Sequence, residues 1–277
     1  MCAAALVVET IGTYDAVGVH GMTSVDDELF VLLDRQDDKQ VAVYSINDYQ
    51  LLRHIILPGY NPPLHHDITS CVRHKCLYMS DWDNSCILRY ELASSATSKW
   101  SVPAKPFCLS VTPSGNLLVT CREPNKVVEL SADSGQTVRE IHLAHLSGIA
   151  DPEHGVQLTN GQFVICHGKT NLFAGGSLHR VCLVGDDGKV TRSYGGERGR
   201  DVGQLEYPCH LAVDKDSQFI FVADHTNGRV VLLSPTLEFV RLVLERHYCP
   251  LRLYFHQATR RLFVSKQYGR EVTVIQL

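Results

Sequence analysis

The chain has 277 residues, of which 44% are hydrophobic, and its 26 basic and 30 acidic side chains leave a formal net charge of −4. Proteins that bind nucleic acid or membrane surfaces carry a clustered excess of Lys and Arg, so neither partner is expected here. The apolar stretch 3–8 has no basic region before it, and no apolar stretch approaches the length of a membrane span. We therefore expect a cytoplasmic protein with a single domain over residues 1–277.

Ten cysteines are present, and none of them forms a C-x-x-C pair. Most lie inside apolar stretches, as Cys108, Cys166 and Cys182 do. Cysteines in such surroundings behave as small hydrophobic side chains. We therefore expect buried, reduced thiols and no disulfide framework.

A short pattern recurs along the chain: an apolar strand, a tight turn and a second apolar strand. Strands rich in β-branched residues and separated by Gly, Asn and Asp are typical of antiparallel hairpins. The first strand of the pattern is expected at 29–34, 77–81, 117–121, 163–167, 219–224 and 262–266, and the second at 41–44, 87–90, 127–130, 181–184, 229–233 and 272–275. The period of roughly 40 to 57 residues lies in the range of propeller blades.

A further strand follows these pairs, for example at 50–57, 137–143 and 238–244. With the strand that precedes each pair, every unit is a four-stranded antiparallel sheet with two faces to cover and two edges to protect. Six such sheets placed in a circle cover one another's faces, so the sequence predicts an all-β, six-bladed β-propeller.

The two ends of the chain fit a closed ring. The sixth unit stops at Leu277 after three strands, whereas the apolar strand 6–11 belongs to no unit. We expect this N-terminal strand to pair as the outer strand of the last blade and so close the propeller.

The fifth unit, Gly203–Leu233, resembles an NHL repeat. It has the Pro-led strand, the strand ending in Val-Ala-Asp, the Asn-Gly-Arg-Val turn and the third strand of that family's pattern. The aspartate of the pattern recurs at Asp34, Asp81 and Asp224, and it is replaced by Cys121, His167 and Lys266. The resemblance implies an NHL-type propeller, a class that often serves as a protein- or RNA-recognition module.

Common enzyme signatures such as G-x-S-x-G, H-E-x-x-H and G-x-G-x-x-G are absent, but one constellation indicates chemistry. When the six units are aligned on their first strand, the position before the alternating stretch is occupied by His20, His66, Phe107, His154, Cys209 and Leu251. The first strand of a propeller blade is the innermost, so His20, His66 and His154 could converge on the axis. Three neutral imidazoles with an open fourth position are a catalytic zinc arrangement, and zinc lowers the pKa of its bound water.

This arrangement is similar to that of the peptidyl-hydroxyglycine amidating lyase family. Members are six-bladed propellers whose zinc histidines occupy the same strand-entry position. The resemblance implies one divalent metal, zinc, on the axis of this protein and a lyase activity. The alternative is that the three histidines pack between blades, each satisfied by a backbone carbonyl.

Loops that enter the first strand and loops that join the second and third strands share one end of a propeller. We therefore expect further polar residues on the face that carries the histidines, where converging ionisable groups define a functional site. The ligand-binding candidates are Asp34, Asp81, Trp82, Asp224 and Arg252. The candidates for moving a proton beside the metal are His167, His210 and Asp67.

Two functions follow from these observations, and the sequence leaves both open. One is a propeller that binds a small molecule or a protein on the His-bearing face and holds a divalent metal there. The other is a metal-dependent lyase or hydrolase of a small molecule. The zinc-ligand spacings and heptads of RING and coiled-coil regions are missing, so a ubiquitin-ligase function is not indicated.

Overall fold

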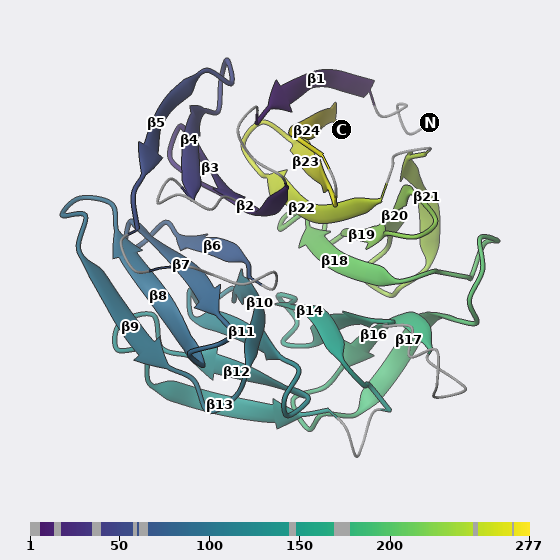
Figure 1. The fold of residues 1–277 in the computed structure, drawn as a ribbon. Helices are drawn as coiled ribbons and strands as arrows, with labels where there is room; N and C mark the ends of the chain where they lie inside the picture. Colours follow the sequence, from purple (N-terminus) through teal and green to yellow (C-terminus); the bar gives the residue numbers. More distant parts are fainter. Residues whose placement is uncertain are drawn as a thin grey trace.

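The computed structural model of the protein describes residues 6–13, 18–34, 40–57, 60, 66–143, 148–168, 178–245, 249–267 and 269–277. Over these residues the chain forms six four-stranded antiparallel sheets. They stand around a common axis as blades, with the first strand of each blade innermost (Figure 1). No helix among the described residues is long and apolar enough to cross a membrane. The predicted all-β, six-bladed propeller is confirmed.

The strands of the first three blades follow the chain from the axis outward. Blade one contains β2 (Val19–Val25), β3 (Glu28–Leu33), β4 (Val41–Ser45) and β5 (Leu51–Ile55). Blade two contains β6 (Ile68–Cys71), β7 (Cys76–Asp81), β8 (Cys86–Glu91) and β9 (Thr97–Ser101). Blade three contains β10 (Pro106–Val111), β11 (Leu117–Cys121), β12 (Lys126–Leu130) and β13 (Thr137–His142).

The last three blades have the same order. Blade four contains β14 (Pro152–Gln157), β15 (Phe163–His167), β16 (His179–Val184) and β17 (Val190–Gly196). Blade five contains β18 (Pro208–Val213), β19 (Ile220–Asp224), β20 (Arg229–Leu233) and β21 (Phe239–Leu244). Blade six contains β22 (Pro250–His256), β23 (Arg261–Lys266), β24 (Glu271–Gln276) and, from the other end of the chain, β1 (Leu6–Gly12).

The closing strand is found where the sequence predicts it. β1 pairs antiparallel with β24, from Leu6 opposite Gln276 to Gly12 opposite Glu271. Blade six is thus built from both ends of the chain (Figure 1). This pairing fastens the last blade to the first part of the chain and closes the circle.

The core consists of separate apolar layers, one between each pair of neighbouring blades. Between blades one and two, for example, Phe30 and Leu32 of β3 pack in one cluster with Leu77 and Met79 of β7. The cysteines contribute to these layers. All nine that are described are free, and eight are buried. Burial raises the pKa of the Cys121 thiol to about 12, so such thiols are inert packing groups.

A β-bulge recurs at the same place in the blades and determines what faces the axis. Pairing between the first and second strands skips one residue in blades one, three, four and five, at His20, Phe107, Glu153 and Cys209. Blade six has one extra residue between Pro250 and Leu253. A bulge re-aims the side chains around it, so it separates two rings of side chains at the axis.

Candidate functional site

The two rings can be defined from the strand register. The bulge ring contains His20, His66, Phe107, Glu153, Cys209 and Leu251, and the axial ring contains the residues that follow them, Gly21, Asp67, Cys108, His154, His210 and Arg252. Blades two and six are placed by matching bonds, because the backbone N–H of Asp67 donates to Ser80 Oγ and that of Arg252 donates to Ser265 Oγ.

This register corrects the alignment that the sequence suggested. His154 does not share a position with His20 and His66, because the bulge of blade four falls on Glu153. His154 belongs to the axial ring, where its neighbour is His210: the two rings stack with centroids 4.0 Å apart and an interplanar angle of 14°. His20 and His66 form a separate pair, with centroids 4.4 Å apart. The structure therefore does not bring the three predicted zinc ligands together as one set.

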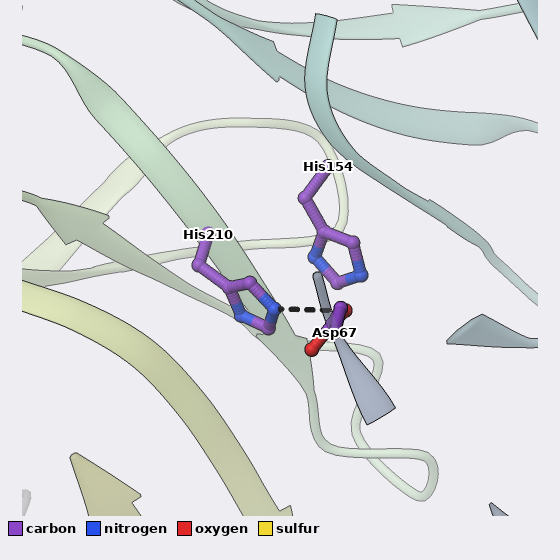
Figure 2. A group of neighbouring side chains, drawn as sticks. All are labelled: Asp67, His154 and His210. Carbon is purple, nitrogen blue, oxygen red and sulfur yellow. Dashed lines mark ion pairs between the residues drawn. The ribbon is translucent and has the colours of Figure 1, made fainter. Parts of the chain in front are cut away.

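A different group of possible metal ligands lies at the axis (Figure 2). Among the described residues, Asp67, His154 and His210 are the one set of three or more His, Cys, Asp or Glu side chains whose ligand atoms all lie within 4.8 Å of one another. All three are buried. His210 Nε2 is 3.7 Å from Asp67 Oδ2, and Arg252 Nε is 3.9 Å from Asp67 Oδ1. By residue type and spacing, this group could hold a metal ion.

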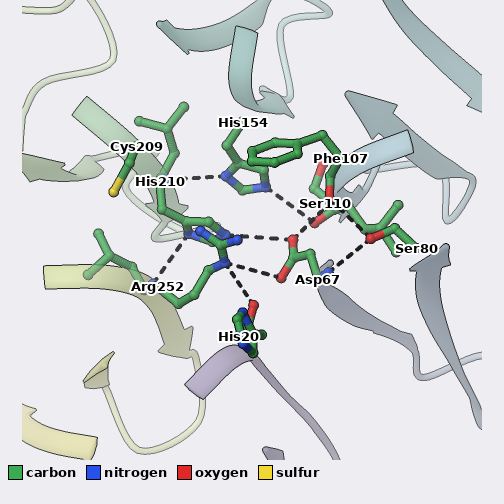
Figure 3. A network of polar contacts seen from close by, with 12 residues as sticks. His20, Asp67, Ser80, Phe107, Ser110, His154, Cys209, His210 and Arg252 are labelled. Carbon is green, nitrogen blue, oxygen red and sulfur yellow. Dashed lines mark hydrogen bonds and ion pairs between the residues drawn. The ribbon is translucent and has the colours of Figure 1, made fainter. Parts of the chain in front are cut away.

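The hydrogen bonds of the axial ring join neighbouring blades (Figure 3). Asp67 Oδ2 accepts from the Leu109 backbone N–H at 2.9 Å. His154 Nδ1 accepts from the Leu211 N–H at 3.1 Å, and His210 Nδ1 accepts from the Leu253 N–H at 3.3 Å.

Arg252 Nε then donates to the His20 carbonyl at 2.8 Å, which links blade six to blade one. Hydroxyl groups complete the circle, since Ser110 donates to the Gly155 carbonyl and Thr23 bonds to Ser70. The axial ring is therefore a latch that joins the innermost strands of neighbouring blades.

These bonds fix the tautomers of both histidines. A backbone N–H can only donate, so Nδ1 of His154 and Nδ1 of His210 must be the unprotonated, accepting nitrogens. In the neutral imidazole the proton is then on Nε2. Nε2–H of His154 donates to the Leu109 carbonyl at 3.2 Å, and Nε2–H of His210 faces the Asp67 carboxylate.

A metal-binding histidine has the opposite arrangement. It offers one nitrogen lone pair to the ion and donates the other N–H to an acceptor. Here the lone pairs of His154 and His210 are both taken by backbone amides. A metal would require the loss of these inter-blade bonds, so the residues as they are bonded do not fit a resident ion.

The charges at the axis are balanced in the absence of a metal. Burial lowers the pKa of both His154 and His210, which keeps the imidazoles neutral. Burial by itself would raise the pKa of Asp67, but the contact with His210 and the Arg252 guanidinium outweigh it and lower this pKa to about 2. Asp67 and Arg252 are thus the two permanent charges, and they are of opposite sign.

The bulge ring lies beside this latch. His20 Nε2 is 3.5 Å from Asp34 Oδ2, and His66 packs edge-on against Tyr60. The carbonyl of His66 receives a long hydrogen bond from Arg252. Asp34 and Arg252, both predicted ligand-binding residues, therefore lie next to His20 and His66, two of the three predicted zinc ligands.

The other predicted site residues have partners within their own hairpins or in an adjoining loop. Burial lowers the pKa of His167 to about 3, and its Nε2 accepts from Arg180 Nε at 2.9 Å. Asp81 accepts from the backbone and side chain of Asn84, as a turn-forming aspartate does. Asp224 accepts from the Glu206 N–H, Asn227 and Arg229. These contacts hold hairpins and loops in place.

A cluster of side chains that includes Phe107 and Glu153 of the bulge ring was not predicted from the sequence, apart from its member Trp82. Arg122 forms a buried ion pair with Glu153 and lies 3.5 Å from the ring centroid of Phe107. The Tyr207 hydroxyl donates to the same carboxylate at 3.4 Å, and its ring packs on His225. Trp82, a predicted ligand-binding residue, reaches Phe107 edge-on with a centroid distance of 6.0 Å. We call these six residues the face cluster.

A sequence signal for this arrangement existed. Pro106, Pro152, Pro208 and Pro250 each open the first strand of a blade. Counting from the proline, instead of from the histidine, places Glu153 in the bulge ring and puts His154 with His210.

No protein-family model matches the sequence, and no curated protein does. The fold is similar to that of virginiamycin B lyase from Staphylococcus aureus, with a TM-score of 0.66 and 11% identity over 97% of this chain and 98% of that chain. A catalytically inactive variant of that enzyme with quinupristin gives the same values. Hydrazine synthase from Kuenenia stuttgartiensis has a TM-score of 0.64 and 12% identity over 95% of this chain and 97% of that chain. At these identities the likeness shows a shared fold, and nothing further.

Proposed function

We propose that this protein is a binding propeller that holds a small polar molecule without a resident metal. The molecule would bind on the face that carries the face cluster and the His20–His66 pair, which we call the central face. The observation that carries the proposal is the bonding of the axial ring: the nitrogens that a metal would need accept backbone N–H groups of the next blade. The axis is then a structural latch, and ligand recognition falls to the side chains around it.

The face cluster and the His20–His66 pair supply suitable groups for recognition. Binding sites combine aromatic and apolar surface with a few fixed polar groups. Here the half-buried side chains of Trp82 and Tyr207 offer ring surface. The buried Phe107 and the nearly inaccessible Arg122–Glu153 pair hold these two rings in place. His225 is oriented as well, because its Nε2 bonds to Gln267 Oε1 at 2.8 Å.

The resemblance of the fifth blade to an NHL repeat is consistent with this function, since that class serves in recognition. One alternative function is a metal-dependent lyase or hydrolase of a small molecule. The Asp67–His154–His210 group favours it by composition. Metal binding by this group requires His154 and His210 to break their hydrogen bonds to the Leu211 and Leu253 amides.

Metal analysis separates the two functions. The protein should be purified without a His tag and its metal content measured by mass spectrometry. We expect no stoichiometric zinc, nickel, iron or manganese. One equivalent of any of these, lost in a His210→Ala variant that still folds, would favour the lyase or hydrolase.

Binding on the central face can be read from Trp82. The chain has two tryptophans, so Trp100→Phe leaves Trp82 as the single reporter. A library of small hydroxylated and carboxylated compounds should contain members that change its fluorescence saturably. Gln267→Ala should weaken them by releasing His225, whereas the exposed Glu245→Gln should not. Compounds that bind equally well to both variants would place recognition elsewhere.

A further inference from the structure

A groove lies on the outside of the propeller, at the seam where β1 of blade six meets blade one. Its volume is about 350 Å³. It is lined by residues 9–12 of β1 and by Thr13, by Leu33 and Tyr44, and by residues 48–51 and His54 of the β4–β5 hairpin. This seam groove is remote from the central face, because β1 and β5 are outermost strands (Figure 1).

The charge of the seam groove has one sign. Glu9 and Asp48 are exposed carboxylates on opposite walls. Neither forms an ion pair with any residue in the described part of the chain. No Lys or Arg lines the groove, and the nearby Arg261 is held by two neutral groups, the Tyr49 hydroxyl and Gln276. Asp48 Oδ1 accepts the Gln50 backbone N–H at 3.3 Å, but neither Asp48 nor Glu9 is neutralised by an ion pair among the described residues, so both can attract an external cation.

Exposed apolar side chains lie on β5 and just beyond it, and one of them, Leu51, lines the groove. Leu51 and Leu52 of β5 are 52% and 51% exposed, and Ile56, just beyond this strand, is 56% exposed. These are three of the eight large hydrophobic side chains that are exposed among the described residues. Since exposed apolar residues gathered on one element indicate an interaction site, this concentration distinguishes β5 from the other outer strands.

β5 is also the edge strand of blade one. An edge strand presents unpaired backbone N–H and C=O groups, to which an extended peptide can add. Inside the groove, Thr13 Oγ1 is buried and has no hydrogen-bond partner among the described residues. A peptide at this seam would therefore meet unpaired backbone groups of β5, the Thr13 hydroxyl, apolar side chains and carboxylates.

We propose that the seam groove binds an extended segment of a partner protein in which a Lys or Arg is flanked by aliphatic side chains. The cation lies between Glu9 and Asp48, and the aliphatic side chains pack on Leu51 in the groove and on the neighbouring exposed Leu52. The volume suits a few side chains, because it is at the small end of the range for ligand pockets. The site is independent of the central face.

The proposal can be tested with pools of labelled heptapeptides whose central residue is Arg, Lys, Ser or Glu and whose flanks are random aliphatic residues. Fluorescence anisotropy should show that the Arg and Lys pools bind better than the Glu pool. The double variant Glu9→Gln, Asp48→Asn should reduce that preference about fivefold, the size expected for two exposed ion pairs. Leu51→Ser should weaken all pools.

Two exposed positions on other blades serve as matched controls. Val138→Ser removes an equally exposed aliphatic side chain from an outer strand, and Glu245→Gln removes an exposed carboxylate. Both should leave binding unchanged. Equal binding of the Arg and Glu pools, or equal loss in the control variants, would overturn the proposal. So would a dimer in sedimentation experiments that the Glu9→Gln, Asp48→Asn variant abolishes, because the occupant would then be a second copy.

Discussion

The axial ring and the bulge ring carry similar side chains one residue apart, yet they use them differently. In the axial ring, Asp67, His154 and His210 each accept a backbone N–H of another blade. In the bulge ring, Glu153 holds Arg122 and Tyr207, and His20 lies against Asp34. The first ring stabilises the closed circle, and the second orients side chains on the face.

The group that faces each nitrogen of a histidine decides the chemistry of that histidine. His154 and His66 are equally buried, at 2% exposure. His154 has both ring nitrogens bonded to backbone groups, and these groups belong to two different blades. A shift of one residue at a bulge is enough to turn a candidate ligand into a structural latch.

The largest effect should come from removing the charge of the latch. Asp67→Asn retains an oxygen for the Leu109 N–H but leaves the Arg252 guanidinium without its counter-ion. A buried charge left unpaired costs about 3 kcal/mol or more of unfolding free energy, measured by urea denaturation. Adding Arg252→Met to this variant should recover part of the loss. Asp34→Asn in the half-exposed contact with His20 should cost about 1 kcal/mol or less.

A smaller loss is expected when one latch histidine is removed. His154→Ala leaves the Leu211 N–H and the Leu109 carbonyl without partners, which costs about 2–4 kcal/mol for two buried groups. The matched variant is His66→Ala in the bulge ring, which breaks neither of these inter-blade bonds. Chemical denaturation of the two variants compares the rings directly. A larger loss for His66→Ala would contradict the assignment of the latch to the axial ring.

The fold could be predicted from the sequence because its signals are local. Alternating apolar strands, Gly- and Asn-containing turns and the unpaired strand 6–11 each report on neighbouring residues, and their period gives the number of blades. The closing pair β1–β24 could be predicted by counting strands, because the last blade lacks one strand and the first strand of the chain belongs to no other blade.

The site was harder to predict because it depends on a non-local register. Whether Glu153 or His154 enters the bulge depends on how Pro152 pairs with His167, and an alignment centred on histidines does not reveal this. The partners of the imidazoles are backbone groups of other blades, which have no sequence signature. For the same reason the sequence did not indicate a role for Arg122, since that role depends on its ion pair with Glu153 in another blade.

Gly21 is the one residue of the axial ring without a side chain, and its substitution should have a smaller effect. Gly21 stands where the other blades have side chains, and a Cβ there would lie 2.7 Å from Asp67 Oδ1 and 2.8 Å from the Ile68 backbone N. Gly21→Ala must displace the carboxylate or β6, so we expect a loss of about 1–3 kcal/mol in unfolding free energy. Gly161→Ala is not a suitable control, because its φ of 88° strains any side chain. Gly155→Ala, with its nearest contact at 3.1 Å, should cost less.

The pH dependence of stability should follow the neutral imidazoles. Burial lowers the pKa of His154 and His210 in the folded protein, whereas the unfolded chain takes up protons below about pH 6.5. The stability that the two neutral imidazoles contribute to the folded state is therefore fully present above pH 6.5, and it is lost as the pH falls below this value. Each such histidine contributes up to about 1.4 kcal/mol per pH unit to the slope. Removing His154 should lower the slope between pH 6 and 5, and the exposed His142→Gln should not.

The smallest expected effect is that of added zinc on the melting temperature. It tests directly whether the axial ring is structural and not a metal site. A ligand that binds only the folded state at 100 times its dissociation constant raises the unfolding free energy by about 2.7 kcal/mol. Such a gain is easily seen as a shift in melting temperature. Because the lone pairs at the axis accept the Leu211 and Leu253 amides, zinc must break two inter-blade bonds to bind. We expect no shift from zinc or from a chelator. A rise that His210→Ala removes, and His20→Ala does not, would show that the latch yields to a metal.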